Sequence, residues 1–285
     1  MAVARSAIAR PVLLNTNKLF RFGNVNAKSL RNKTEVFIDH VIGESIDVCV
    51  VTKTWLKNND SVTLAALTPT GFSFRNVNRQ SASSGGGTGV IFRDSFKVWG
   101  VDRTHRESFE ASEWNFTTGG KTTKFIVVYR PPYSEAHPVT PSAFFREFTL
   151  YLENVVLCTE ILVIAGDFNF HMADPSDADA KKLNDLLETF SLSQHLTFAT
   201  HVSGHWLDLI ITRATNIMVC SPRPSLLLSD HCFVECVLSI ASPSLTVKEV
   251  AFRRWKQIDI SAFKKDILAS QLYSLPSDDI AANYD

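Results

Sequence analysis

Acidic, amide and imidazole side chains lie at the ends of apolar runs along this sequence. Asp167 and Asn169 follow the run ILVIA in the segment GDFNFH, and Asp208 lies within GHWLDLI. Asp230 and His231 are neighbours in LLSDH. Carboxylate and amide oxygens are ligands that suit Mg²⁺ or Mn²⁺, and a histidine beside an acid can move a proton or stabilise charge. Such a set suits hydrolysis of a phosphodiester by an activated water.

Four further polar residues lie in or at the ends of runs that are typical of buried strands. Asn24 and Asn26 close the first run, Lys53 lies within VVTKTWL, and Tyr129 ends a run in VYRPP. Residues in such places are held by rigid elements and yet face a rim, where functional sites tend to form. We therefore count them among the candidate site residues.

Each of these residues also has a purely structural interpretation. Asn24 could close a turn, Asp167 could be the turn aspartate of the sequence GDFN, and Asp230 could cap the last strand. His201 and His205 are spaced as H-x-x-x-H, but no helical pattern surrounds them, so they are weak evidence for a metal. The structural interpretation is stronger for any single residue, whereas the whole set, with each member at a strand end, favours a functional site.

The elements that must position these residues are short apolar runs that alternate with turn signals and amphipathic segments. The run Val48–Trp55 is almost continuously apolar, which is typical of a strand buried on both faces. Helices outside packed sheets make an α/β sandwich the expected architecture. The predicted helices are Glu35–Ile42 after the cap Thr34, a segment that begins at Thr140-Pro141, and Ala178–Phe190. The predicted strands are Lys18–Asn24, Val48–Trp55, Phe72–Val77, Gly89–Arg93, Phe96–Val101, Ser108–Thr117, Lys124–Tyr129, Ile161–Ala165, Leu207–Thr212 and Phe233–Ile240.

The composition limits what the chain can bind. Its 285 residues contain 29 Lys+Arg and 29 Asp+Glu, a formal net charge of +0, so nucleic-acid binding would need local basic patches. The loops Arg75–Gly87 and Arg103–Arg106 could supply phosphate contacts, but the zero net charge favours an ordinary solvated surface. The 5 Cys form no C-x-x-C pair, which argues against a disulfide framework or a zinc site. No apolar run reaches the ~18 residues of a membrane span, and no obligate protein partner is evident.

We divide the chain into three segments. Residues 1–17 are a basic leader, similar in composition to an organellar transit peptide, which we expect to be flexible and of no consequence. Residues 18–241 form the folded domain. In residues 242–285 the pattern weakens, and the basic segment Val250–Leu268 is expected to be helical and part of a linker or tail.

The motifs together carry a family resemblance that runs from about Phe20 to Ile240. NVNAKSLRNK, TKTWL, GGGTGVIF, VYRPP, GDFNFH, GHWLDLIIT and LSDHCFV resemble segments of the endonuclease/exonuclease/phosphatase superfamily, which includes deoxyribonuclease I and the apurinic/apyrimidinic endonucleases. More narrowly, the YRPP, LDLIIT and TWL segments resemble the endonuclease domain of non-LTR (LINE-type) retrotransposons. The resemblance implies a deoxyribonuclease I-like, four-layer α/β sandwich of two packed mixed sheets flanked by helices, with a site where the sheets meet.

The resemblance also implies an activity, a nick in DNA that depends on Mg²⁺ (or Mn²⁺) and leaves a 3′-hydroxyl to prime reverse transcription. Carried over to this sequence, the family pattern places Asn24 near the metal and the phosphate. Tyr129 would contact the phosphate, and Asn169 would hold a phosphate oxygen.

The remaining implied roles concern the attacking water and the developing charge. Asp167 would align or deprotonate the water, and Asp230 would help to hold the metal, directly or through water. His231, oriented by Asp208, would stabilise charge on the phosphate. These roles suit in-line attack, in which positioning and charge stabilisation supply most of the rate.

Lys53 departs from the family pattern. The family has Glu at this place as its principal metal ligand, whereas this chain has a cation. Two unit charges about 4 Å apart interact by roughly 4 kcal/mol at an effective dielectric constant of about 20, and each 1.36 kcal/mol is about tenfold in rate. We therefore expect weakened metal binding and cleavage reduced by several orders of magnitude. Alternatively, the Lys53 ammonium occupies the metal's place, pairs with Asp208 or Asp230, and holds a phosphate itself.

Two other functions remain open. The chain could be a catalytically dead nucleic-acid-binding module that keeps the fold, and it could be a phosphatase or phosphodiesterase for lipids or inositol phosphates, although YRPP and LDLIIT argue against the latter. A single base change gives Lys for Glu, and a tail toward a missing reverse-transcriptase region agrees with a decayed copy of a mobile element. A DNA substrate implies a nuclear location, but no convincing basic import cluster is visible.

Overall fold

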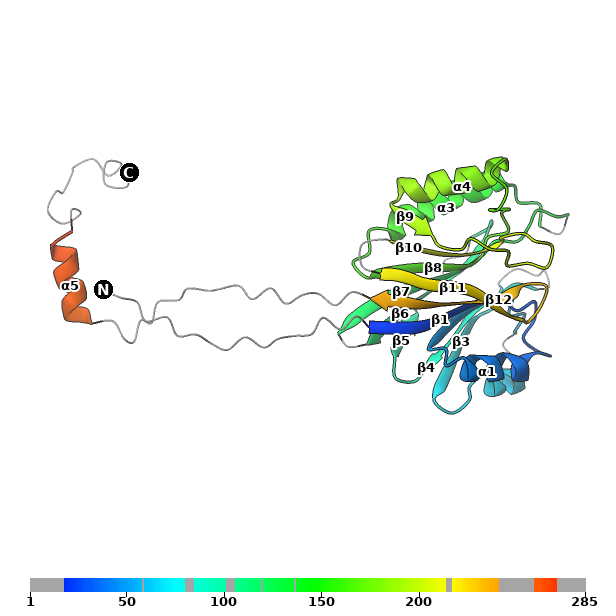
Figure 1. Cartoon of the computed structure of the whole chain (residues 1–285), viewed down its shortest axis with the longest axis horizontal. Helices are drawn as coiled ribbons and strands as arrows, with labels where there is room; N and C mark the ends of the chain where they lie inside the picture. Colours follow the sequence, from blue (N-terminus) through cyan, green and yellow to red (C-terminus); the bar gives the residue numbers. More distant parts are fainter. Residues whose placement is uncertain are drawn as a thin grey trace. The chain divides into compact units, whose positions relative to one another are not determined.

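Two six-stranded mixed sheets pack face to face in the computed structural model (Figure 1). From edge to edge, the first sheet consists of β11 (Ile217–Leu227), β12 (Cys232–Ile240), β1 (Lys18–Asn26), β2 (Val48–Thr52), β4 (Thr88–Arg93) and β3 (Phe72–Val77). The second sheet consists of β5 (Lys97–Gly100), β6 (Glu110–Thr118), β7 (Lys121–Tyr129), β8 (Ile161–Asp167), β10 (Asp208–Arg213) and β9 (Leu192–Gln194). The structure describes residues 18–57, 59–79, 85–100, 106–118, 120–135, 137–213, 217–240 and 259–270.

The chain divides into two compact units, Met1–Ser242 and Pro243–Asp285. The first unit contains both sheets and the helices α1 (Thr34–Gly43), α2 (Ser61–Ala66), α3 (Pro141–Val155) and α4 (Ala178–Thr189). The described part of the second unit contains α5 (Ile260–Leu268), whose N-cap Asp259 accepts hydrogen bonds from two backbone N–H groups of the first turn. Among the residues that the structure describes, no helix has the length and apolar character that a membrane span requires.

Three hydrophobic clusters separate four layers. One cluster fills the space between the two sheets and includes Phe22, Val50 and Phe125. A second lies between the second sheet and the helices α3 and α4, and a third lies between the first sheet and α1. Figure 1 shows α1 on one side of the sheets and α3 with α4 on the opposite side. The predicted four-layer α/β sandwich, deoxyribonuclease I-like in its arrangement, is therefore confirmed.

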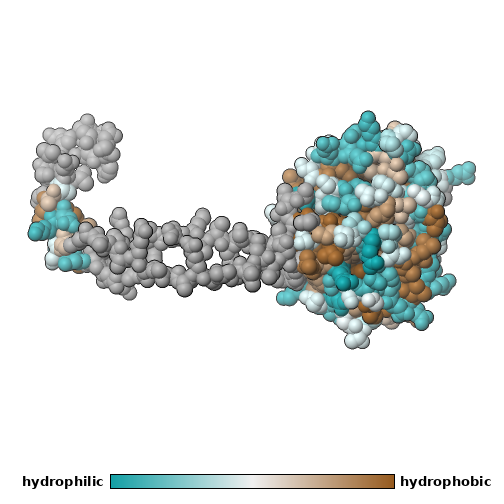
Figure 2. All heavy atoms as spheres, in the orientation of Figure 1, coloured by the Kyte–Doolittle hydropathy of each residue, from teal (hydrophilic) through white to brown (hydrophobic). Residues whose placement is uncertain are grey.

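The central strands are apolar on both faces because each is covered on both sides. All five residues of β2 and all seven of β8 are buried. In β8, Ile161 and Val163 pack between the sheets, whereas Leu162 and Ile164 pack against the helices. A run without alternation is the pattern that this double burial requires. At the surface, polar and apolar residues are interspersed over the face seen in Figure 2, since a folded chain leaves many apolar atoms exposed.

Gly166 lets β8 approach β7 closely just before the candidate site. Its φ is +142°, and a Cβ at this position would lie 1.9 Å from the backbone oxygen of Val128. No side chain fits in that space, so the sheet itself requires the glycine of GDFN. The glycine thereby fixes the place at which Asp167 leaves the strand.

Several predicted boundaries need correction. The second strand ends at Thr52 rather than Trp55, because Lys53 and Trp55 take positive φ values of 50° and 55° that interrupt extended chain. Thr34 is the first residue of α1 and not its cap, since its hydroxyl donates to the Leu30 carbonyl oxygen at 2.8 Å. By contrast, the Thr140 hydroxyl accepts from the Ala143 N–H at the start of α3, as predicted.

Three elements were not predicted at all, namely α2, β9 and β11. The first two are only six and three residues long, too short for a periodic signal. The strand β11 contains prolines in the sequence IMVCSPRPSLL, and its pairing with β12 shifts register twice. Some of the predicted segments lie outside the described residues. They are the leader 1–17, residues 250–258 of the basic helix, and residues 101 and 103–105.

Candidate active site

Strand register brings the candidate residues of the second sheet together. Asp167, the last residue of β8, lies beside Tyr129 in the parallel pair with β7 and beside Asp208 in the antiparallel pair with β10. In the first sheet, Asn26 ends β1 and pairs with Thr52 of β2, and Lys53 follows directly. Both sheets therefore deliver polar side chains to the same edge of the sandwich.

Asp167 is the residue on which the two sheets converge. Its Oδ2 accepts a hydrogen bond from Asn26 Nδ2 at 2.7 Å and lies 3.4 Å from the Lys53 Nζ. Its Oδ1 accepts from the Asn169 backbone N–H at 3.1 Å. Complete burial raises the pKa of Asp167, and the nearby Asp208 carboxylate raises it further, while Lys53 opposes both. The ammonium of Lys53 is thus a counterion for a buried acid.

His231 is held in a fixed orientation by Asp208. The His231 Nδ1 lies 2.7 Å from Asp208 Oδ2, and both side chains are almost fully buried. Burial lowers the pKa of His231, but the Asp208 carboxylate outweighs it and the pKa is raised above the usual histidine value. The other ring nitrogen, Nε2, lies 3.1 Å from Asn26 Nδ2. Because the Asn26 amide nitrogen is a donor, Nε2 accepts in this contact, and His231 can stabilise charge on a phosphate when Nε2 is protonated.

Asp230 lies beside this pair but has different partners. Its Oδ2 is 2.7 Å from the Lys28 Nζ and 3.6 Å from His201 Nε2. The His201 ring meets the His231 ring edge to face at a centroid distance of 4.8 Å. Partial burial raises the pKa of Asp230, but the Lys28 ammonium and His231 together lower it to about 2. Asp230 therefore stays ionised at neutral pH.

The Asp230→Asn variant should be less stable than the native chain at pH 7, and the difference should vanish in acid. A carboxyl whose pKa is lowered from 3.8 to about 2 stabilises the fold above pH 3.8, and this stabilisation is lost as pH falls through about 2. The side chain is 30% exposed, so solvent screening should reduce the effect to about 1 kcal/mol. Urea unfolding of both proteins from pH 7 to pH 2 measures it, and a difference independent of pH would contradict the assignment.

Tyr129 lies between two cations. The Lys53 Nζ is 5.1 Å and the Arg79 Cζ 5.6 Å from the centroid of the Tyr129 ring. Arg79 donates from Nε to Glu110 Oε1 at 2.6 Å, and the Gly87 N–H donates to Glu110 Oε2 at 2.6 Å. Burial raises the pKa of Tyr129 well above its usual range, so the phenol keeps its proton and can donate a hydrogen bond to an anion. Arg79 was not singled out from the sequence, where it was only one member of the loop Arg75–Gly87.

The predicted site residues Asn169 and Asn24 lie in different environments. Asn169, at a φ of 51°, donates from Nδ2 to the Arg130 carbonyl oxygen at 2.7 Å and is fixed beside Asp167. Asn24 is fully buried, and neither polar atom of its side chain has a hydrogen-bond partner in the described structure. The residue in contact with Asp167 and His231 is Asn26, not Asn24. Asn24 and Asn26 share one face of β1 because they are two residues apart. Only Asn26, the last residue of the strand, reaches the rim.

Two sets of side chains in the described structure could offer ligand atoms to a metal. They are Asp167, Asp208 and His231, and His201, Asp230 and His231, each with ligand atoms within 4.8 Å of one another. Asp208 Oδ1 and Asp230 Oδ1 are buried and have no hydrogen-bond partner among the described residues. Acidic and imidazole groups for a divalent cation are therefore present.

The place of the expected glutamate, however, does not fit a divalent cation. The Lys53 ammonium lies 3.4 Å from Asp167, where the family resemblance puts an ion held by a carboxylate at position 53. The bond between Asp208 Oδ2 and His231 Nδ1 leaves Asp208 Oδ1 and His231 Nε2 for an ion, so the misfit lies at Lys53 alone. The ion pair that forms is with Asp167, and not with Asp208 or Asp230 as the alternative interpretation of the sequence had it.

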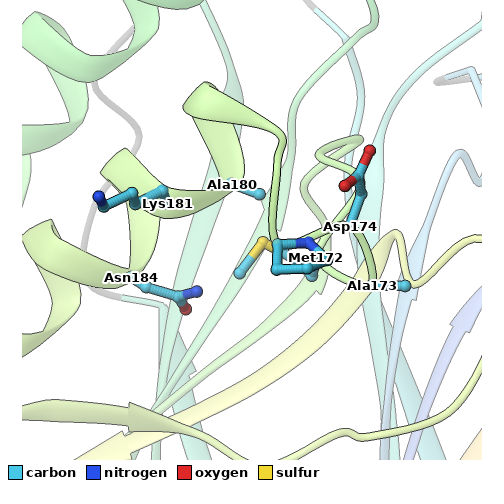
Figure 3. A pocket seen from close by; sticks show the side chains of 7 residues that line it. Met172, Ala173, Asp174, Ala180, Lys181 and Asn184 are labelled. Carbon is cyan, nitrogen blue, oxygen red and sulfur yellow. The ribbon is translucent and has the colours of Figure 1, made fainter.

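A pocket of about 390 Å³ lies elsewhere in the fold, beside α4 (Figure 3). It is lined by Met172, Ala173, Asp174, Pro175, Ala180, Lys181 and Asn184. None of the residues that meet around Asp167 lines it. His171, near this pocket, stacks on His205 at a ring distance of 4.1 Å and is not part of the Asp167 cluster.

Comparison with known proteins gives one family and one fold. The model of the Endonuclease/Exonuclease/phosphatase family matches residues 14–231. A search of curated proteins found no matching relative. Solved structures share the fold but have low sequence identity to this chain. Their similarity therefore supports the fold assignment and nothing further.

The endonuclease domain of TRAS1, a telomere-specific non-LTR retrotransposon, is 13% identical with a TM-score of 0.60, and the match covers 79% of this chain and 99% of that chain. The AP endonuclease LMAP from Leishmania major is 12% identical with a TM-score of 0.59, over 79% of this chain and 88% of that chain. TDP2 from D. rerio, solved with a single-strand DNA product, is 13% identical with a TM-score of 0.57, over 77% of this chain and 98% of that chain.

Proposed function

The chain belongs to the endonuclease/exonuclease/phosphatase family, and we propose that it is a DNA-nicking phosphodiesterase whose cleavage is impaired by Lys53. Its substrate is a phosphodiester of DNA, and its product is a nick with a 3′-hydroxyl. The likeness to the TRAS1 endonuclease domain and to D. rerio TDP2, solved with a single-strand DNA product, supports this substrate class.

The side chains around Asp167 support hydrolysis by an activated water. Asp167 aligns the water and accepts its proton, which its raised pKa makes easier. Tyr129, kept protonated by burial, donates to a phosphate oxygen. Asn169 donates one amide N–H to the Arg130 carbonyl oxygen, and its second amide N–H donates to the phosphate.

His231 stabilises the charge that develops on the phosphate. Asp208 fixes the ring through Nδ1, so Nε2 faces the cluster that Asn26 and Asp167 form. A positioned donor of this kind is worth roughly a hundredfold to a thousandfold in rate. In relatives with a carboxylate at position 53, a bound Mg²⁺ would add electrostatic stabilisation of the phosphate.

The observation that carries the impairment is the distance of 3.4 Å between the Lys53 Nζ and Asp167 Oδ2. The ammonium neutralises the residue that should activate water and repels a divalent cation from the same place. The catalytic set is otherwise assembled. A DNA-binding module without cleavage is the second candidate function, and the same ion pair favours it.

The experiment that tests the proposed function gives the Lys53→Glu variant two substrates in Mg²⁺ or Mn²⁺. Supercoiled plasmid should be converted to nicked circles, and p-nitrophenyl phosphate should not be hydrolysed. Turnover of the phosphomonoester without plasmid nicking would instead assign the chain to the phosphatases of this family. Abolition of nicking by a further Asp167→Ala substitution excludes a contaminating nuclease.

A further inference from the structure

Lys53 is fixed in place by its backbone and not only by its side chain. It has a φ of 50°, and its carbonyl oxygen accepts from the Ser29 N–H at 2.9 Å. The next residues are tied to the glycine loop, since the Trp55 N–H donates to the Gly86 carbonyl oxygen at 2.9 Å. A lysine on such a segment presents its ammonium at one place, which lowers the entropy lost when it binds a ligand.

The ammonium lies among groups that would surround a phosphate. Its Nζ is 3.4 Å from Asp167 Oδ2 and 5.1 Å from the Tyr129 ring. The side chain is 17% exposed, so the ammonium group is partly buried and still accessible from the solvent. An ammonium has three N–H donors, and the one recorded ion pair leaves the others for an anion that enters beside Tyr129.

Apart from the contact of 3.6 Å between His201 and Asp230, the ion pair of Lys53 is the longest in the cluster. Asp230 lies 2.7 Å from Lys28, Asp208 lies 2.7 Å from His231, and Glu110 lies 2.6 Å from Arg79. Because Coulomb energy falls with distance, the pair at 3.4 Å is the least costly to share with a second anion. Each of the other acids has a closer partner of its own.

We propose that the Lys53 ammonium takes the place of the divalent cation as the charge that holds a DNA phosphodiester, so that this site binds DNA without metal. Asp167 keeps the ammonium in position, and the Tyr129 hydroxyl supplies a second donor to the same phosphate. The inference rests on the proposed function for the substrate class, but it concerns binding and not cleavage. It makes the native chain a metal-independent binder of the substrate that its relatives cleave.

Fluorescence anisotropy of a labelled DNA duplex, titrated with the full chain, tests this inference. The native chain should bind equally well in EDTA and in Mg²⁺. Lys53→Gln should weaken binding in EDTA about tenfold, and the slope of log K against log salt should fall by about 0.9, the loss of one phosphate contact. Lys53→Arg should keep the native slope. Lys53→Glu should bind weakly in EDTA and recover when Mn²⁺ is added.

The matched control is Lys97→Gln. Lys97 is an exposed lysine of β5 that pairs with Thr117, whereas Glu110 marks the site end of β6. The seven residues of strand from Glu110 to Thr117 place Lys97 roughly 23 Å from the site end of the sheet, at about 3.3 Å per residue. The Lys97→Gln variant should therefore bind DNA with the native affinity and salt slope. Thermal unfolding shows whether each variant is folded.

The result that overturns the inference is a native affinity that rises about tenfold or more when Mg²⁺ replaces EDTA, or a folded Lys53→Gln variant with native affinity and slope. Failure of Lys53→Glu to nick plasmid would count against the proposed function and leave this measurement unaffected. Conversely, efficient nicking by Lys53→Glu together with metal-dependent binding by the native chain would support the proposed function and refute the inference.

Discussion

Lys53→Glu should nick supercoiled plasmid about a thousandfold faster than the native chain in Mg²⁺. The substitution removes a repulsion of roughly 4 kcal/mol between the ammonium and a cation at the same place, and each 1.36 kcal/mol is about tenfold in rate. It also releases Asp167, whose Oδ2 lies 3.4 Å from the Lys53 Nζ. Initial rates of conversion to nicked circles, measured for both proteins over a range of enzyme concentration, give the ratio.

The matched control for this gain is Lys97→Glu, which makes the same charge reversal at the opposite end of the second sheet and should leave the native rate unchanged. Native nicking at the rate of Lys53→Glu, abolished by Asp167→Ala, would show that Lys53 does not impair the enzyme. If neither protein nicks although both are folded, the site has lost more than one ligand, and DNA binding without cleavage becomes the better function.

His231→Ala in the Lys53→Glu background should lower nicking about a hundredfold to a thousandfold, the usual effect of removing one positioned donor to a developing charge. The effect should lie in kcat, because the ring acts on charge that appears in the transition state. Asp208→Asn should act in the same direction, since Asp208 Oδ2 orients the ring through its Nδ1 at 2.7 Å. Single-turnover rates at saturating DNA measure both.

The control histidine for this series is His171, which stacks on His205 and does not belong to the Asp167 cluster. His171→Ala should therefore leave the rate unchanged. A His231→Ala variant that is folded and keeps the full rate would remove the histidine from the chemistry.

Much of the site was predictable because neighbouring strands place their ends together: Tyr129 and Asp167 end β7 and β8, and Asp208 begins the antiparallel β10. Asp167, Asp208 and Tyr129 were each recognised as polar residues at the end of an apolar run, and the register of β7, β8 and β10 makes them neighbours. Their spacing in the sequence is large, but the sheet fixes their separation in space. The family resemblance and the four-layer fold follow from the same strand-end motifs.

What the sequence could not supply was the choice between equivalent positions and the partners of charged groups. Asn24 and Asn26 share a face of β1, and only the end point of that strand decides which of them reaches Asp167. Alternation alone therefore left the two equal. A closer count of the strand from Phe22, which is buried between the sheets, would have shown that the later residue lies nearer the rim.

The ion pairs of the site could not be predicted from the sequence either. Lys28 and Asp230 are separated by 202 residues and meet at 2.7 Å, and Arg79 reaches Glu110 across two sheets. The alternative interpretation of the sequence paired Lys53 with Asp208 or Asp230, but Asp208 pairs with His231 and Asp230 with Lys28. Asp167 is the acid that remains for it. Such pairings depend on side-chain competition in the folded state, which local sequence patterns do not encode.

The central claim, that the Lys53 ammonium occupies the place of the divalent cation, is tested most directly by Mn²⁺ uptake. The electron paramagnetic resonance signal of free Mn²⁺ decreases when the ion is coordinated, so titration of the protein into Mn²⁺ counts bound ions without any substrate. We expect Lys53→Glu to take up an ion under conditions in which the native chain leaves the free Mn²⁺ signal unchanged. Equal uptake by the native chain and Lys53→Glu, lost in Asp167→Ala, would contradict it.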